Sequence, residues 1–263
     1  MTRFETILFE TTPDKVGTIT INRPDKLNSF NGTMCAEFQT LWTRIAEDDE
    51  VNAVILRASP GRAFSTGMDV WNPGNYLGSE QLWNKRDPGE RLGPKRNRCW
   101  KPVVAAVHGM CAGGAFYWLN ESDIVICSSD AEFFDPHVTY GLTAALEPIG
   151  MRWKTALPEV LRMALMGNDE RLGAETALRI SLVTEIVPKE ALWTRAREIA
   201  AVIAEKPSVA TQGTVRAIWE SLDATRSASL NTALKYCLLG NEQGRKEAPR
   251  EELMKKSKKY RVR

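Results

Sequence analysis

Short apolar runs recur along the first half of the chain, and they constrain its fold more than any other feature. Runs at residues 53–56, 102–107 and 124–127 carry the valine, isoleucine and alanine content of buried strands. Helical patterns lie between them, near residues 79–91 and 113–119. Because parallel strands need crossover connections, which are usually helices, this alternation predicts an α/β fold with a parallel sheet.

The two ends of the chain have different patterns. Residues 4–9 and 16–21 predict a hairpin, and Asn31 precedes a helical pattern of apolar residues at three- and four-residue spacing (Met34, Phe38, Leu41, Trp42 and Ile45). Beyond Pro148 helical patterns dominate, at residues 157–166, 174–179, 189–204, 208–222 and 230–239. We therefore predict an α/β core over residues 1–190 and a C-terminal helical region over residues 191–263.

Composition excludes several classes of protein. The chain has 263 residues, 43% hydrophobic and 26% charged, which excludes a disordered, collagen-like or small disulfide-stapled protein. The run at residues 103–107 is far shorter than the ~18–20 residues of a membrane-spanning helix. The first residues lack the apolar stretch of a signal peptide. We expect a cytoplasmic protein with no membrane partner.

Cysteine and histidine usage predicts that no metal is bound. The five cysteines are scattered without a C-x-x-C pair, and His108 and His137 are the only histidines. Basic charge gathers at the C-terminus, where residues 245–263 hold nine lysines and arginines against three glutamates. Tyr260 is the only aromatic residue among these charges, whereas proteins that bind single-stranded nucleic acid interleave several. We therefore expect no nucleic-acid partner.

Two glycine-bearing turns follow predicted strands, at residues 62–69 and 108–115. Ligands of open α/β sheets gather outside the carboxyl ends of the strands, so both turns could face one pocket. Neither turn carries a phosphate-binding glycine motif. The spacing fits an oxyanion hole, in which two backbone N–H groups stabilise a carbonyl oxygen that gains charge, and it fits equally well glycines that only permit tight turns.

Three segments of the chain, in the same order as in the family, resemble the enoyl-CoA hydratase/isomerase (crotonase) superfamily. Residues 21–29 (INRPDKLNS) are similar to its N-R-P-x-x-x-N-[AS] segment, and residues 63–69 (AFSTGMD) to its A-F-[SC]-A-G-x-D loop. Residues 101–114 (KPVVAAVHGMCAGG) are similar to its K-P-V-I-A-A-[VI]-x-G-x-x-x-G-G segment. With a weaker match at residues 175–187, the resemblance extends over at least the first 190 residues.

The resemblance implies a fold of repeated ββα turns with a C-terminal helical region, an acyl-CoA thioester as the ligand, and a homotrimer or dimer of trimers. It implies no cofactor, since CoA is part of the substrate. The two oxyanion donors would be the backbone amides of Met68 and Gly114. Positions implied to contact the substrate or its CoA are Lys26, Leu27, Arg62, Ala63, Phe64, Ser65, Asp69, Gly113 and Tyr117.

Some of these positions also have simpler interpretations. A solvated surface charge is the commoner role of any single lysine or arginine, which applies to Lys26 and Arg62. For Asp69, a carboxylate that caps a turn is the favoured interpretation.

The chain departs from the family at two positions. In the hydratases two glutamates hold the water that adds to the double bond, and here the matching positions are Tyr117 and His137. A neutral tyrosine, with an ordinary pKa near ~10, is a poor base at neutral pH. We therefore expect double-bond isomerisation or another enolate reaction rather than simple hydration.

Two other groups could transfer protons. His137 titrates near neutrality and Asp135 could orient it, while Glu147 follows an apolar stretch that could raise its pKa. Glu147 also precedes Pro148, where a glutamate in a first helical turn is common. The alternatives to isomerisation are an enoyl-CoA hydratase and a CoA-thioester-binding protein without turnover.

Overall fold

The three apolar runs of the first half form three strands of a six-stranded sheet in a computed structural model, which describes residues 4–72, 86–248, 250–255 and 262. The strand order is β1-β2-β3-β5-β7-β10. β1 and β2 are the predicted antiparallel hairpin, and β2, β3, β5 and β7 pair in parallel, as predicted. The strands are β1 (Ile7–Thr11), β2 (Val16–Ile21), β3 (Ala53–Ala58), β5 (Val103–Val107), β7 (Ile124–Ser128) and β10 (Glu185–Val187).

A second sheet, with the order β4-β6-β8-β9, is built from strands of two or three residues. β4, β6 and β8 come directly after the larger strands β3, β5 and β7, so the chain makes one strand in each sheet at every pass. This repetition, with helices between the passes, confirms the predicted repeated ββα fold. The bounds are β4 (Ala63–Ser65), β6 (Met110–Ala112), β8 (Glu132–Phe134) and β9 (Leu172–Gly173).

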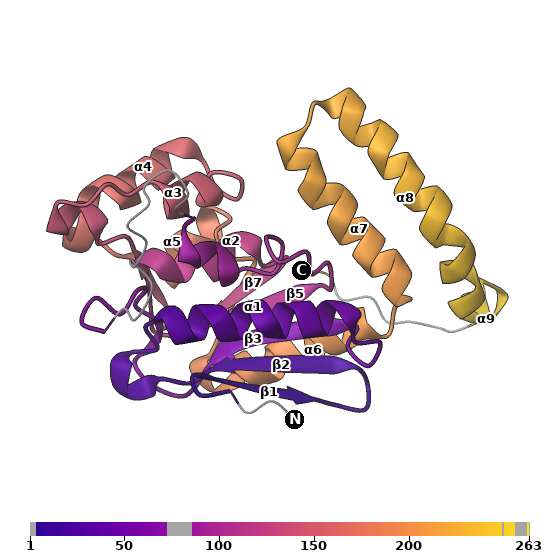
Figure 1. Ribbon diagram of the computed structural model, residues 1–263, viewed down its shortest axis with the longest axis horizontal. Helices are drawn as coiled ribbons and strands as arrows, with labels where there is room; N and C mark the ends of the chain where they lie inside the picture. The colour runs from indigo at the N-terminus through magenta and orange to yellow at the C-terminus, as the bar shows by residue number, and fades with distance from the viewer. Residues whose placement is uncertain (1–3, 73–85, 249, 256–261, 263) are drawn as a thin grey trace.

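Helix α1 (Gly32–Glu47) covers one face of the large sheet, as Figure 1 shows. It begins where predicted, because the Asn31 side chain accepts a hydrogen bond of 3.0 Å from the amide of Met34. Six of its apolar residues fall on one helical face and are buried against the core (Met34, Cys35, Phe38, Leu41, Trp42 and Ile45).

Helix α6 (Leu192–Ala204) packs on the opposite face of the same sheet. Four of its residues at helical spacing, Leu192, Ala196, Ala200 and Ala204, contact buried residues of β2, β3, β5 and β7. The sheet is therefore buried on both faces, as parallel sheets usually are. The predicted division at residues 190/191 is not tested by this packing and stays a prediction, although α6 lies on the α/β core.

Helices α7 (Ser208–Glu220) and α8 (Arg226–Glu247) pack against each other and extend away from the sheets, as Figure 1 shows. Trp219 at the end of α7 attaches this pair to the core, because its Nε1 donates a 2.6 Å hydrogen bond to Asp123. The other helices are α2 (Phe116–Glu121), α3 (Leu146–Met151), α4 (Leu157–Met166), α5 (Ala174–Arg179) and α9 (Arg250–Lys255).

Short 3₁₀ helices connect these elements. They are η1 (Pro24–Lys26), η4 (Pro88–Arg91), η5 (Gly113–Ala115), η6 (His137–Tyr140), η7 (Gly167–Asp169), η8 (Lys189–Ala191) and η9 (Ser221–Asp223). Of the helix predicted near residues 79–91, residues 79–85 lie outside the described residues and the C-terminal part is η4. The predicted helix at residues 113–119 is η5 followed by α2.

Four of the five cysteines, Cys35, Cys99, Cys111 and Cys127, are buried, and Cys237 on α8 is exposed. Burial raises the pKa of the Cys35 and Cys127 thiols to about 12. Among the described helices, none is both long and apolar enough to cross a lipid bilayer.

Candidate active site

A cavity of about 1190 Å³ lies where the ends of several elements meet. Its walls come from η1, the turn after β4, the start of η5 and α2, and the segment from β8 to α3. Many of the predicted site residues line it: Lys26, Leu27, Met68, Asp69, Gly113, Gly114, Tyr117, His137 and Glu147. The chain thus brings these positions, far apart in sequence, to one cavity.

The two glycine-bearing turns contact each other in this cavity. Gly67 has φ +83°, and a Cβ atom there would lie 2.8 Å from the amide nitrogen of Gly114. A Cβ atom on Gly114 would in turn lie 2.6 Å from the Phe30 ring. Only glycine at both positions allows this approach, so the glycines bring two backbone segments together rather than merely permitting turns.

The direction of the Met68 amide follows from its neighbours. Phe30 donates its amide to the Gly67 carbonyl and accepts the Asp69 amide through its own carbonyl, both at 2.8 Å. Phe30 and Met68 form a parallel bridge in which the residues on either side of Met68 make both hydrogen bonds, so the Met68 N–H points away from Phe30. The Gly114 amide lies in the first turn of η5, where a helix provides no internal acceptor.

Buried polar side chains form hydrogen bonds that connect the loop after β2, residues 22–29, to these turns. Asn28 is buried, and its side chain donates to the Ala63 carbonyl at 2.9 Å and accepts the Arg23 amide at 2.9 Å. Arg23 forms a 2.9 Å ion pair with Asp69. Asp69 also accepts the Asn72 amide at 3.0 Å, so it acts as a turn carboxylate although it lines the cavity.

Asp135, His137 and Glu147 form a chain of titratable groups beside the turns. His137 Nδ1 lies 2.5 Å from Asp135 Oδ1, and His137 Nε2 lies 3.9 Å from Glu147 Oε1. Asp135 is fully buried and Glu147 nearly so, whereas a quarter of the His137 side chain is exposed. His137 Nδ1–H thus donates to Asp135, which leaves Nε2 facing Glu147 and the cavity.

The surroundings raise the pKa of both proton-transfer groups. The hydrogen bond to Asp135 raises the pKa of His137, and the charges of Asp135 and Glu147 act in the same direction. Burial raises the pKa of Glu147, and the nearby charges of Asp135 and Asp87 add to this effect. Both groups therefore hold protons more strongly than they would in water, as groups that transfer protons near neutral pH do.

The structure adds a carboxylate that the sequence motifs do not indicate. Asp87 lines the cavity beside Tyr117, whose hydroxyl donates a hydrogen bond to Asp87 Oδ2. Asp87 precedes η4, and in the sequence Asp-Pro-Gly is typical of a turn, so only the folded chain reveals its approach to Tyr117. Arg171, Tyr140 and Trp71 also line the cavity and were not predicted.

The remaining predicted residues lie elsewhere. Ala63, Phe64 and Ser65 form the buried strand β4, and the Phe64 ring packs on Trp118 with centroids 6.2 Å apart. Arg62 is exposed and lines a separate hollow with Met110 and Lys189. No contact with a substrate is tested for any of these residues, so their roles stay predictions.

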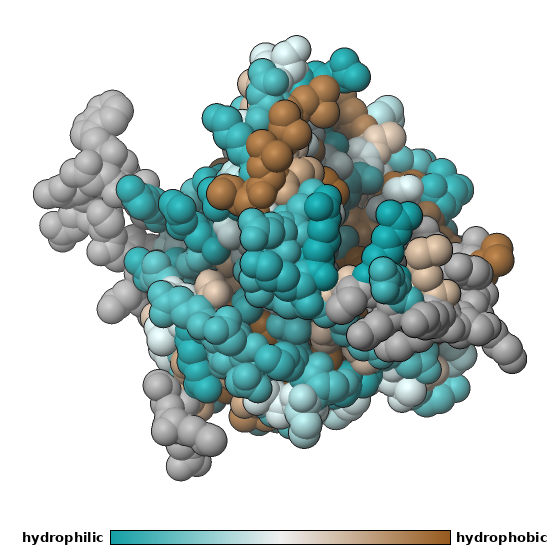
Figure 2. Space-filling model, turned by 90° about the vertical axis from the view of Figure 1, so that its right-hand side faces the viewer, coloured by the Kyte–Doolittle hydropathy of each residue, from teal (hydrophilic) through white to brown (hydrophobic). Residues whose placement is uncertain are grey.

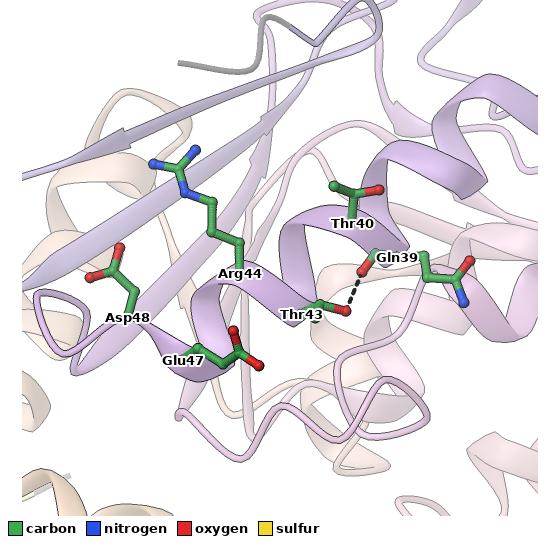
Figure 3. A pocket seen from close by; sticks show the side chains of 6 residues that line it. All are labelled: Gln39, Thr40, Thr43, Arg44, Glu47 and Asp48. Atoms are coloured by element: carbon green, nitrogen blue, oxygen red, sulfur yellow. Dashed lines mark hydrogen bonds between the residues drawn. The ribbon is translucent and has the colours of Figure 1, made fainter.

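A polar surface hollow lies along the outer face of α1, shown in Figure 3. Its side chains come from the last turns of one helix and its C-cap, and the dashed bond in Figure 3 is a local one from Thr43 to the Gln39 carbonyl. Among the described residues, those that line this hollow all come from α1 and its C-cap. By contrast, side chains from several elements converge on the cavity of about 1190 Å³.

Comparison with known proteins agrees with this geometry. The family model of enoyl-CoA hydratase/isomerase matches residues 11–251. The chain belongs to the enoyl-CoA hydratase/isomerase family. The resemblance seen in its three sequence segments is thereby confirmed, and the chain is an enzyme of this family.

Individual members of the enoyl-CoA hydratase/isomerase family show the extent of the similarity. The chain is 31% identical over 229 residues to a short-chain-enoyl-CoA hydratase of Clostridium acetobutylicum, covering 84% of this chain and 83% of the relative. It is 31% identical over 224 residues to the human mitochondrial Delta(3,5)-Delta(2,4)-dienoyl-CoA isomerase, covering 81% of this chain and 68% of the isomerase. A solved enoyl-CoA hydratase/isomerase structure from Mycobacterium paratuberculosis superposes with a TM-score of 0.83, at 33% identity, over 99% of this chain and 100% of that one.

Proposed function

We propose that the protein isomerises a double bond in an acyl-CoA thioester. The thioester oxygen would lie between the amides of Met68 and Gly114, which stabilise the negative charge of an enolate. The His137–Glu147 pair would transfer the proton. The observation that carries this proposal is that this pair, 3.9 Å apart and with both pKa values raised, lines the same cavity as the two glycine-bearing turns.

An isomerase needs a proton-transfer group but no bound water. Tyr117 and His137 stand where the family resemblance places the two water-holding glutamates of a hydratase. A tyrosine hydroxyl and an imidazole do not orient water for addition as two carboxylates do. The chain nevertheless keeps a buried carboxylate, Glu147, beside the imidazole, which favours the transfer of a proton.

Binding of CoA would use the rim of the cavity. Lys26 and Arg171 line it, and cationic side chains bind phosphates. We expect CoA thioesters to bind more tightly than the corresponding free acids, because phosphates and pantetheine supply remote binding energy. Isothermal calorimetry with acetyl-CoA and with acetate measures this difference, and equal affinities would contradict CoA recognition.

Hydration is the second candidate function, and one observation favours it. Asp87 places a carboxylate beside Tyr117, and Glu147 places one beside His137, so each of these two positions has a carboxylate next to it in the cavity. Two carboxylates are what the addition of water to an enoyl-CoA requires.

The two reactions are separated by parallel assays with purified protein. Isomerisation of trans-3-hexenoyl-CoA is followed by the rise of the conjugated thioester absorbance, and hydration of crotonyl-CoA by its loss. We expect efficient isomerisation and weak hydration. Efficient hydration with no isomerisation would replace the proposal by its alternative, and binding without either reaction would favour a CoA-thioester-binding protein.

We also propose that the chain assembles with copies of itself, as its family resemblance implies. Leu230, Leu234 and Leu238 form a stripe on α8 and are 57%, 59% and 72% exposed. A similar stripe on α4, Leu157, Leu161 and Leu165, is 55%, 48% and 69% exposed. Figure 2, which views the side of α7 and α8, shows hydrophobic side chains in a band on an otherwise largely hydrophilic face. Apolar area of this kind marks a protein interface.

A further inference from the structure

Asp87 lies at the wall of the cavity, and both of its carboxylate oxygens accept hydrogen bonds. Its Oδ1 accepts the Gly89 amide at 3.0 Å and so caps η4, while its Oδ2 accepts the Tyr117 hydroxyl. The cap fixes the carboxylate, and Gly89 packs directly on the Tyr117 ring, where no side chain would fit. The pair is therefore held in one geometry by η4.

Tyr117 lines the same cavity as Glu147 and the turn of Gly114. Its ring packs edge-on to Phe30, at 6.4 Å between centroids, and Phe30 in turn contacts the Gly114 position. A hydroxyl that donates its proton to a carboxylate still has lone pairs that accept another proton. Tyr117 can thus take up a proton as it passes its own to Asp87.

We infer that Asp87 is a positioning residue that, through the Tyr117 hydroxyl, provides the second proton-transfer group of the reaction. This inference rests on the proposed acyl-CoA isomerisation. It gives the cavity two proton-transfer groups, Asp87 with Tyr117 and Glu147 with His137, drawn from different elements. Each pair contains one carboxylate and one side chain that can pass a proton on.

The proton and electron balance is complete without another reactant. A substrate C–H proton passes to Tyr117 Oη while the tyrosine proton passes to Asp87, so tyrosine stays neutral and Asp87 becomes protonated. The C–H electron pair delocalises into the thioester carbonyl, whose oxygen takes the charge. The His137–Glu147 pair then gives a proton to the far carbon of the conjugated system, and both pairs return to their starting states by exchange with solvent.

The test compares Asp87→Asn with Glu90→Gln. Both variants replace a carboxylate of the same short segment by an amide, but Glu90 forms a surface ion pair with Arg96 and does not line the main cavity. Asparagine caps a helix as well as aspartate does, so Asp87→Asn keeps η4 capped. We expect Asp87→Asn to lower kcat for trans-3-hexenoyl-CoA by ~10²- to 10⁴-fold with little change in KM, and Glu90→Gln to behave as wild type.

Four further readouts exclude a merely structural role. Asp87→Glu should restore part of the activity. Tyr117→Phe, which keeps the ring packing, should lose about as much activity as Asp87→Asn, and the double variant should lose no more than either single one. The limb of the pH–rate profile that belongs to Glu147 should move to lower pH in Asp87→Asn, because a neighbouring negative charge is removed.

Equal rates for Asp87→Asn and Glu90→Gln, or additive losses in the double variant, would overturn the inference. Exchange of the α-protons of butanoyl-CoA with deuterium from the solvent is measured in the same variants. Exchange by the wild type without isomerisation would overturn the proposed function alone, and the loss of exchange in Asp87→Asn relative to Glu90→Gln would still support the role of Asp87. Absence of both reactions in the wild type would overturn both.

Discussion

His137 and His108 lie in surroundings that shift their pKa values in opposite directions. The hydrogen bond to Asp135 raises the pKa of His137, whereas burial lowers that of His108, whose two ring nitrogens have no hydrogen-bond partner among the described residues. A pH titration by NMR should therefore show two separate imidazole midpoints on either side of ~6.5. The chain has only these two histidines, so His137→Ala assigns the signals.

Asp135→Asn should lower the midpoint of His137, because the charge that favours the imidazolium is removed. The midpoint of His108 should not move. An unchanged His137 midpoint in this variant would mean that the hydrogen bond to Asp135 does not control the imidazole.

Glu147→Gln should lower kcat for 3-enoyl-CoA isomerisation by ~10²- to 10⁴-fold, since an amide cannot transfer the proton. Because burial raises the pKa of Glu147, the limb of the wild-type pH profile that belongs to it should lie above the ordinary glutamate value of ~4.3 and vanish in the variant. Glu159→Gln is the matched control, since Glu159 pairs with Arg179 away from the cavity. If His137→Ala alone loses activity, the proton is transferred by the imidazole.

Helix α2 connects the site to the core through Trp118. Its ring lies 5.7 Å from Phe30, 5.2 Å from Phe38 and 6.2 Å from Phe64, and is fully buried. The same short helix carries Tyr117 into the cavity. The packing of Trp118 in the core thus fixes the position of Tyr117 at the cavity.

Trp118→Ala should lower the free energy of unfolding by ~3–5 kcal/mol, the usual cost of removing a buried aromatic side chain. Trp153→Ala is the control, because Trp153 is 49% exposed and its loss leaves no cavity. Urea unfolding followed by far-UV circular dichroism measures both. Similar losses in the two variants would show that the aromatic cluster does not stabilise the fold.

Sequence patterns predict the long elements better than the short ones. Helix α1 is predicted from its cap and its apolar spacing, and the long parallel strands are predicted from their apolar runs. In each of these elements the apolar pattern extends over several helical turns or strand residues, which is long enough to recognise. β4, β6 and β8 have three residues each, which is too short for a period, and they were included in predicted loops or left unassigned.

The candidate site follows the same rule. Met68, Gly114, His137 and Glu147 are predicted from motifs and local sequence, and the fold brings them to one cavity. Asp87 carries no motif, and its approach to Tyr117 depends on where η4 packs. A contact between residues thirty positions apart is set by tertiary structure, which local patterns do not encode.

At the scale of the whole molecule, the exposed leucines of α8 predict how assembly can be disrupted. Leu234→Glu with Leu238→Glu should reduce the mass measured by light scattering, because charge at an apolar contact opposes association. Lys235→Glu changes charge on the same helix at a neighbouring position and should leave the mass unchanged. Equal masses for all three proteins would contradict assembly through α8.

The distribution of the thiols has a practical consequence for following this assembly. Since four cysteines are buried and Cys237 is exposed on α8, a maleimide should add once to the native chain and five times after unfolding, as counted by intact-mass spectrometry. Cys237 lies next to Leu238 in the proposed contact. A fluorophore at Cys237 would therefore report association in the wild-type sequence, and its attachment should be faster in the Leu234→Glu, Leu238→Glu variant if neighbouring copies cover the helix.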